Sequence, residues 1–198
     1  VQPRRHREAL LGERDGRRHD LGERLPGNVE ADRQRAHVGH ELRFAGIDRR
    51  ARGIGRAVAH KLAAAGCDVI ANYYNSHEEA EALCAELRAQ GRRALAVQGS
   101  VGVPDSVDEM FAELPKHFSR LDIVVSNAAS GVLKPAMDMT LKHWRWCMET
   151  NAFALNLLAQ RAAPMMGPGG RIVAMSSLGS VRAMPHYAFI GASKAALE

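Results

Sequence analysis

The chain has 198 residues, 46% of them hydrophobic, which is enough for one domain with a buried core. No apolar run is long enough to span a membrane, and no basic segment followed by an apolar one marks a secretory signal. The three cysteines show neither CxxC pairing nor nearby histidines at metal spacing, so we expect packed, reduced thiols and no metal site. These features predict a cytoplasmic protein.

The net charge of +5 is concentrated in the first quarter of the chain. Residues 1–52 contain thirteen arginines, no lysine and nine acidic residues, whereas the rest is nearly neutral. A broad nucleic-acid-binding face is therefore not expected on the main part of the chain.

Residues 1–45 show no lasting helix or strand period, and we expect an irregular, arginine-rich segment ahead of a domain over 46–198. Three interpretations are open: a disordered tail, an arm that binds nucleic acid or acidic partners, or translation in a wrong reading frame. The last is favoured by the odd arginine usage. In addition, Ile47-Asp48-Arg49-Arg50 can be encoded so that a one-base shift reads x-Thr-Gly-Gly, the start of a glycine motif.

Regular elements begin at Arg52, and no buried strand is recognisable before it. The first predicted elements are, in chain order, a helix from Arg52 to Gly66, a strand over Val69–Asn72, a helix from Ser76 to Gly91, a strand over Ala94–Val97 and a helix over Asp105–Phe118 interrupted by Pro115. They are followed by a strand over Leu121–Val125, a helix from Thr140 to about Ala163, a turn over 164–170, a buried strand over Arg171–Met175 and a helical start at Ala192–Leu197. This alternation predicts an α/β fold with a doubly wound parallel, Rossmann-like sheet that lacks strands at both ends.

A partial glycine-rich turn opens the first helix, at Arg52, Gly53, Ile54 and Gly55. Such a turn lets backbone N–H groups and the helix dipole meet a pyrophosphate. The strand that follows ends in Tyr73-Tyr74-Asn75, without the acid that binds the ribose 2′-hydroxyl of NAD. Because Arg52 could pair with a 2′-phosphate, NADPH is favoured over NADH.

Small and polar residues follow two later strands. Asn127 and Ala128 come after Leu121–Val125, where a flat ligand could approach closely, and Asn127 could tie neighbouring strands together. Ser100 and Val101 follow the preceding strand, at a place where an adenine could lie. Ordinary tight turns would explain each pair equally well.

Asn151 lies inside the long predicted helix, where an asparagine is costly unless its amide bonds a carbonyl or holds a water. His143, eight residues earlier, is expected to pack or face solvent rather than act as a base.

The stretch with the most candidate catalytic side chains is Ser176–Lys194. It lies between a strand and a helix, where α/β enzymes usually have their catalytic residues. Tyr187 can donate a hydrogen bond or a proton to a developing oxyanion. Lys194, seven residues later, carries three donors that can hold ribose hydroxyls. Three serines, Ser176, Ser177 and Ser180, lie in the same stretch ahead of Tyr187.

Together, the Arg52–Gly55 turn, Asn127-Ala128, Asn151, the serines after Met175 and Lys194 resemble the short-chain dehydrogenase/reductase family. The usual Tyr-x3-Lys pattern of that family would need tyrosine at position 190, which is Ile190 here. Tyr187-x6-Lys194 is instead similar to the enoyl-[acyl-carrier-protein] reductase branch. The stretches over 127–133, 143–146 and 176–180 resemble its NADPH-dependent type III enzymes.

This resemblance implies hydride transfer from NADPH to the β-carbon of a trans-2-enoyl thioester, carried by acyl carrier protein or CoA, in fatty-acid synthesis. It assigns Tyr187, Lys194, Ser177 and Asn151 to catalysis, with Lys194 also binding the cofactor. Ser177 would have a supporting polar role, and Ser176 and Ser180 are the alternatives to it. It also implies that full-length relatives are homo-oligomers and that a chain ending at Glu198 is a fragment. The alternatives are a carbonyl (3-ketoacyl-type) reductase of the same family, an inactive truncated product, or a basic-tailed binding protein.

Overall fold

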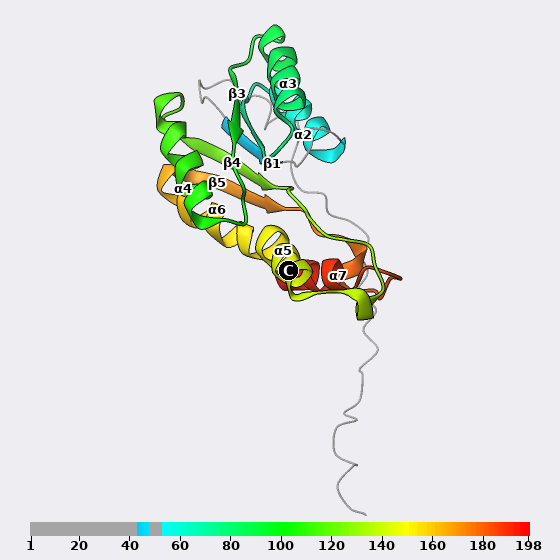
Figure 1. Cartoon of the computed structure of the whole chain (residues 1–198). Helices are drawn as coiled ribbons and strands as arrows, with labels where there is room; N and C mark the ends of the chain where they lie inside the picture. Colours follow the sequence, from blue (N-terminus) through cyan, green and yellow to red (C-terminus); the bar gives the residue numbers. More distant parts are fainter. Residues whose placement is uncertain (1–42, 48–52) are drawn as a thin grey trace, which may run out of the picture. The chain divides into compact units, whose positions relative to one another are not determined.

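In the computed structural model, residues 43–47 and 53–198 are described, and they belong to one compact unit over 41–198. Five parallel strands form one sheet in the order β3-β2-β1-β4-β5 (Figure 1). Parallel neighbours joined by helical crossovers confirm the predicted Rossmann-like α/β fold. Because the strands are parallel, the residues that follow them lie at one edge of the sheet.

The central strand corrects the expectation that none precedes Arg52. Strand β1, Arg43–Ile47, pairs with β2 on one side and with β4 on the other. It also places residues 43–45 in the sheet rather than in the predicted irregular segment. Its five residues carry little local strand signal, and its place depends on backbone pairing with both neighbours, which a single-segment pattern does not encode.

The first half of the chain follows the predicted order closely. It contains α2 (Gly53–Ala64), β2 (Asp68–Tyr73), α3 (His77–Ala89), β3 (Ala94–Gln98), α4 (Pro104–Glu113) and the short 3-10 helix η1 (Leu114–Lys116). Gly66 ends α2 as expected: its φ is +99°, and its N–H donates to the Ala63 carbonyl at 3.0 Å. Pro115 ends α4 and turns the chain into η1, also as expected.

The second half contains β4 (Leu121–Ser126), the 3-10 turn η2 (Ala136–Asp138), α5 (Leu141–Met148), the π-helical turn η3 (Glu149–Phe153), α6 (Ala154–Ala162), the 3-10 turn η4 (Ala163–Met165), β5 (Met166–Ala174), the 3-10 turn η5 (Leu178–Ser180) and α7 (Ala188–Leu197). The long predicted helix is thus α5 and α6, joined through η3. Thr140 begins it with a capping box, because its Oγ1 accepts from the His143 N–H and its own N–H donates to His143 Nδ1 at 3.2 Å.

Strand β5 differs from the prediction in two ways. Residues 167–170, expected in a turn, belong to the strand as an irregularity: pairing with β4 jumps from Met166 to Arg171, and Gly169 has a φ of +90°. The strand is also not buried, since Val173 is 46% exposed. Among the described strands β5 is the last in the sheet, so it pairs only with β4.

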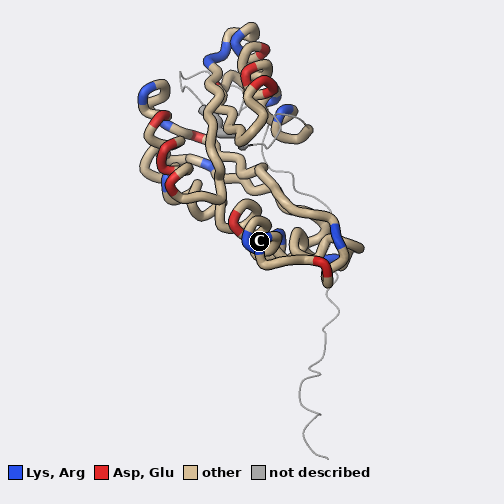
Figure 2. Tube along the Cα trace, in the orientation of Figure 1, with Lys and Arg blue, Asp and Glu red and all other residues tan. Residues whose placement is uncertain are grey.

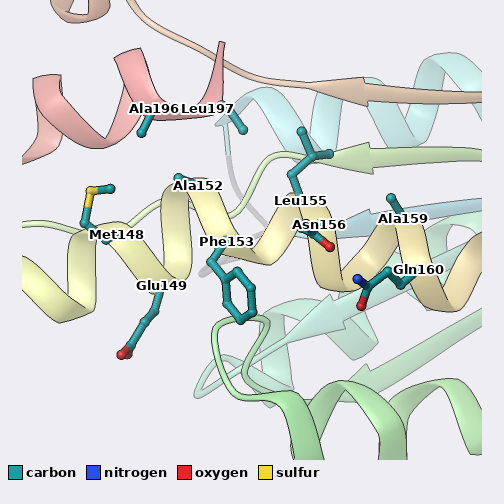
Figure 3. Close-up of a pocket in the computed structure, with 10 residues that line it drawn as sticks. All are labelled: Met148, Glu149, Ala152, Phe153, Leu155, Asn156, Ala159, Gln160, Ala196 and Leu197. Atoms are coloured by element: carbon teal, nitrogen blue, oxygen red, sulfur yellow. The ribbon is translucent and has the colours of Figure 1, made fainter.

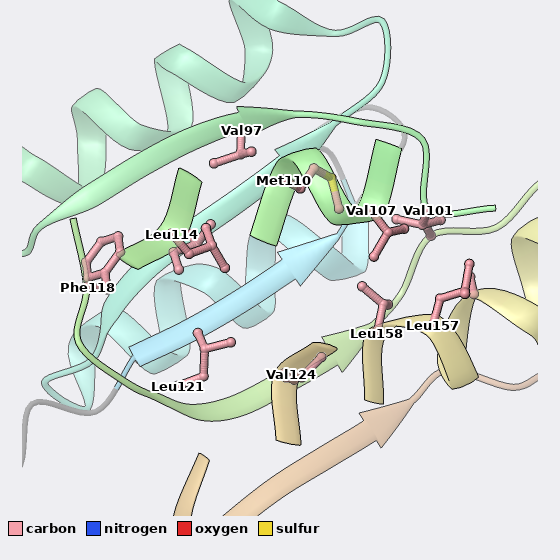
Figure 4. Packing of buried hydrophobic residues seen from close by; sticks show 14 residues of the cluster. Val97, Val101, Val107, Met110, Leu114, Phe118, Leu121, Val124, Leu157 and Leu158 are labelled. Atoms are coloured by element: carbon pink, nitrogen blue, oxygen red, sulfur yellow. The ribbon is translucent and has the colours of Figure 1, made fainter. Parts of the chain in front are cut away.

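Two apolar clusters cover the faces of the sheet. One joins α2 and α3 to the sheet through residues such as Ala59, Leu83 and Leu87. The other joins α4 and α6 to it and is drawn in Figure 4, where Leu158 and Val124 are labelled. The three cysteines, Cys67, Cys84 and Cys147, are buried and free, as predicted.

Charged residues of both signs lie along the helices in Figure 2. Several form ion pairs across elements, such as Arg93 with Asp68 at 2.8 Å and Arg161 with Asp108 at 2.5 Å. Within 43–47 and 53–198, no helix is both long and apolar enough to cross a bilayer.

We expect Leu158→Ala to lower the free energy of unfolding by about 2–5 kcal/mol, because Leu158 is 1% exposed in the α4–α6 cluster and its loss leaves a cavity. Urea unfolding followed by circular dichroism measures this. Leu141→Ala is the control, since Leu141 is 62% exposed and its truncation should change stability by no more than about 0.5 kcal/mol. Equal losses in the two variants would contradict this description of the core.

Candidate active site

Tyr187 and Ser177 meet beyond the carboxyl end of β5. Ser177 precedes η5, and Tyr187 is the residue at which α7 begins. The Tyr187 hydroxyl lies 3.2 Å from Ser177 Oγ, so either hydroxyl can donate to the other. Of the three serines considered from the sequence, Ser177 is thus the one whose side chain contacts the phenol. Helix α7 starts four residues earlier than expected, so Tyr187 directly precedes it and Lys194 lies within it.

Lys194 is buried, with 5% of its surface exposed, although lysine normally keeps its ammonium in water. Its Nζ donates to the main-chain carbonyl of Met175 at 2.6 Å, at the end of β5. Burial lowers the pKa of the Lys194 ammonium below its ordinary value. Because the ammonium has three donors and bonds one carbonyl among the described residues, two donors are left for another ligand.

Asn151 is held in the π-helical turn and is 2% exposed. Its Oδ1 accepts from the Ser130 N–H at 2.6 Å, and its Nδ2 donates to the Ser130 carbonyl and to Ser193 Oγ, both at 2.8 Å. The expectation that this amide bonds a carbonyl is confirmed. These bonds join the loop after β4 to α7 one residue before Lys194.

The glycine turn opens α2 after β1. Gly53 has a φ of +63°, a conformation that favours glycine, and a Cβ added there would meet nothing within 4 Å. Ile54 is 58% exposed and Gly55 is buried. Arg52 lies outside the described residues.

The other predicted cofactor residues lie at the same edge of the sheet. Asn127 and Ala128 follow β4, and Ala128 is buried. Ser100 and Val101 follow β3, but the Val101 side chain packs into the α4–α6 cluster, so its main chain is what a ligand could reach.

No role was predicted for Asn72, but its side chain links neighbouring strands in the way that was expected of Asn127. Its Nδ2 donates to the carbonyls of Val97 and Gly99, both at 3.1 Å.

Ile190, at the position where the common pattern has tyrosine, packs on the loop after β4. A Cβ built on Gly131 would lie 2.2 Å from Ile190 Cγ1, so the isoleucine rests directly on that glycine. The side chain at position 190 is therefore apolar, and Tyr187 carries the phenol at the N-terminal end of α7.

A cavity of about 610 Å³ lies along α5, η3, α6 and the end of α7 (Figure 3). Residues such as Met148, Phe153 and Leu197 line it, and none of the predicted site residues does. The chemistry-bearing side chains therefore lie at the sheet edge and not in this cavity.

Residues 49–198 match the protein family described as Enoyl-(Acyl carrier protein) reductase, which is well over half of the chain. The chain belongs to the short-chain dehydrogenase/reductase family. This short-chain dehydrogenase/reductase is 42% identical over 147 residues to 1-cyclohexenylcarbonyl-CoA reductase of Streptomyces collinus, covering 74% of this chain and 52% of the relative. It is 35% identical over 147 residues to hydroxynaphthalene reductase arp2 of Aspergillus fumigatus, covering 74% and 54%. The chain thus spans about half the length of these relatives.

Solved structures agree with this family. A short-chain dehydrogenase from Burkholderia cenocepacia J2315 in complex with NADP superposes with a TM-score of 0.75 at 36% identity, over 80% of this chain and 64% of that one. The landomycin C-6 ketoreductase LanV with bound NADP and rabelomycin gives a TM-score of 0.72 at 32% identity, over 78% and 69%.

Several residues that shape the site of this short-chain dehydrogenase/reductase were missed from the sequence. Gly131, Gly179 and Ser193 act through contacts between segments far apart in the chain. His186, which precedes Tyr187, has a φ of +60°, and its carbonyl accepts from the Lys134 N–H at 3.2 Å. For Gly179, His186 and Ser193 the local signal is their closeness to Tyr187 and Lys194 in the sequence, whereas Gly131 lies in the 127–133 stretch after β4.

We expect Asn151→Ala to lower the free energy of unfolding by about 1–3 kcal/mol, because it removes three buried hydrogen bonds to the Ser130 main chain and the Ser193 hydroxyl. Chemical denaturation measures the loss. Asn156→Ala is the matched control, since Asn156 is exposed on α6, the helix that follows the π-turn. If the two variants are equally stable, the three bonds of Asn151 do not hold the site.

Proposed function

We propose that the protein reduces the carbon–carbon double bond of a trans-2-enoyl thioester, carried by acyl carrier protein or CoA, at the expense of NADPH. The observation that carries this proposal is the placement of the phenol: Tyr187 contacts Ser177 from the first residue before α7, while position 190 is filled by Ile190. This is the Tyr-x6-Lys arrangement that resembles enoyl reductases.

Tyr187 is the group that would act on the substrate. Reduction at the β-carbon places negative charge on the thioester oxygen, and a phenol is a good hydrogen-bond donor to that oxygen and a source of its proton. Ser177 Oγ, 3.2 Å from the phenol, can hold the Tyr187 hydroxyl in one orientation. We therefore assign Tyr187 to catalysis and Ser177 to support of its hydroxyl.

The residues present fit NADPH, which supplies the hydride when bound. Gly53 starts α2 with a positive φ and open space where a side chain would be, so the helix N-terminus can accept a pyrophosphate. Lys194 Nζ has donors beyond its bond to Met175 and can hold the ribose hydroxyls. The end of β2, at Tyr73 and Tyr74, carries no acid that would repel a 2′-phosphate. The NADP found in related structures supports the same choice.

The surroundings of Tyr187 suit an apolar acyl group. Leu178, Val181 and Met184 lie in the segment that joins Ser177 to Tyr187, and they are 57%, 73% and 45% exposed. The relative from Streptomyces collinus is named for a CoA thioester, which supports a thioester substrate here.

A carbonyl reductase of the same family is the second candidate. The relatives named hydroxynaphthalene reductase and the ketoreductase LanV favour it. In that reaction Tyr187 would donate its proton to the ketone oxygen, so the residue set is shared and the substrate distinguishes the two.

Purified chain should oxidise NADPH faster with crotonyl-CoA than with acetoacetyl-CoA, followed by the loss of NADPH absorbance. Tyr187→Phe should lower the rate with crotonyl-CoA on the order of 100-fold, because it removes the donor and keeps the ring. Lys142→Ala, on the exposed surface of α5, is the control and should leave the rate unchanged.

Faster turnover of acetoacetyl-CoA would replace the proposal with the carbonyl reductase. An unchanged rate in Tyr187→Phe would remove Tyr187 from catalysis. If the folded chain binds no NADPH, the inactive product is the correct alternative.

A further inference from the structure

The ring of Tyr187 lies directly on Gly179, a buried residue of η5. A Cβ built on Gly179 would be 2.3 Å from Tyr187 Cε1 and 2.6 Å from Cδ1, far inside van der Waals contact. Since real Cβ atoms do not come so close to other atoms, any side chain at 179 would have to displace the ring or the turn.

The η5 turn has little space into which it could shift away from the Tyr187 ring. Its other side faces α7, where a Cβ built on Gly191 would be 2.7 Å from the Gly179 carbonyl oxygen. Within the turn, the Ser177 carbonyl accepts from both the N–H and the Oγ of Ser180, at 3.0 and 2.8 Å. The main chain of Tyr187 belongs to the first turn of α7, because the Gly191 N–H donates to the Tyr187 carbonyl at 2.7 Å. The displacement therefore falls on the Tyr187 ring.

We propose that Gly179 is a positioning residue: the missing side chain at 179 lets the Tyr187 ring lie where its hydroxyl meets Ser177 and the substrate oxygen. This inference rests on the proposed function for the reaction in which the phenol takes part. Its structural core, the dependence of the ring position on residue 179, can be tested separately. A methyl group at 179 moves the ring and carries the hydroxyl away from Ser177 Oγ.

The kinetic test is Gly179→Ala. Displacing a catalytic group by about 1 Å can cost about 100-fold in rate, so we expect a fall of this order in kcat with crotonyl-CoA. KM should stay within about twofold, because the acyl and cofactor contacts are not changed. Gly167→Ala is the control, since a Cβ there meets Arg120 Nη2 at an ordinary 3.6 Å.

A double-mutant cycle separates positioning from general damage. In the Tyr187→Phe background the ring is kept but there is no hydroxyl to misplace, so adding Gly179→Ala should cost less than about twofold more. A full, additive loss in that background would show that Gly179 acts on something other than the phenol and would overturn the proposal.

A spectroscopic measurement that does not depend on catalytic turnover distinguishes the positioning role of Gly179 from the proposed function. The chain has three tyrosines, so labelling with 3-fluorotyrosine gives three ¹⁹F resonances, and Tyr187→Phe identifies the one from Tyr187. Gly179→Ala should shift that resonance, while Gly167→Ala should not. A shift in a protein that fails to reduce crotonyl-CoA supports the positioning role and rejects the proposed function. An unmoved resonance in folded Gly179→Ala overturns the positioning role.

If Gly179→Ala alone does not fold, adding Tyr187→Ala provides the test. The second change removes the ring atoms that the new methyl group would meet, so the double variant should recover a cooperative thermal transition. A double variant that still fails to fold would show that the methyl group clashes elsewhere, which contradicts the proposal.

Discussion

Three hydrogen bonds from the buried amide of Asn151 join the loop after β4 to helix α7. The π-helical turn between α5 and α6 positions the Asn151 amide so that it bonds the Ser130 main chain and the Ser193 hydroxyl. Because a buried main-chain group left unpaired is costly, the loop, the turn and α7 are fixed together. Lys194 follows Ser193, so this interaction also places the buried ammonium at the end of β5.

Two glycines, which have no side chain, allow the close packing that positions the Tyr187 phenol. Gly131 makes room for Ile190, and Gly179 makes room for the Tyr187 ring. Helix α7 can therefore lie against both loops at the carboxyl edge of the sheet. Parallel strands bring Gly53, at the start of α2, and the Tyr187 phenol to one edge of the sheet, although they are more than 130 residues apart in sequence.

The helices and strands with strong periodicity could be predicted from the sequence, as could the bonded amide of Asn151. Tyr187 and Lys194 could be named as candidates from the sequence, and their catalytic roles stay a proposal. Strand β1 could not, because two neighbouring strands rather than its own residues determine it. The exposure of β5 depends on what lies beside it in the sheet. The tie made by Asn72 and the contact of Gly179 depend on distances between segments that no local pattern contains.

The central claim is that Tyr187, and not another hydroxyl, meets the oxygen on which charge develops. The most direct measurement is a crystal structure of the chain with NADP and crotonyl-CoA bound. It should place the thioester oxygen within hydrogen-bonding reach of the Tyr187 hydroxyl, at about 3 Å, with the β-carbon facing the nicotinamide. A thioester oxygen held by Ser176 or Ser180, with the Tyr187 hydroxyl turned away from it, would contradict the account.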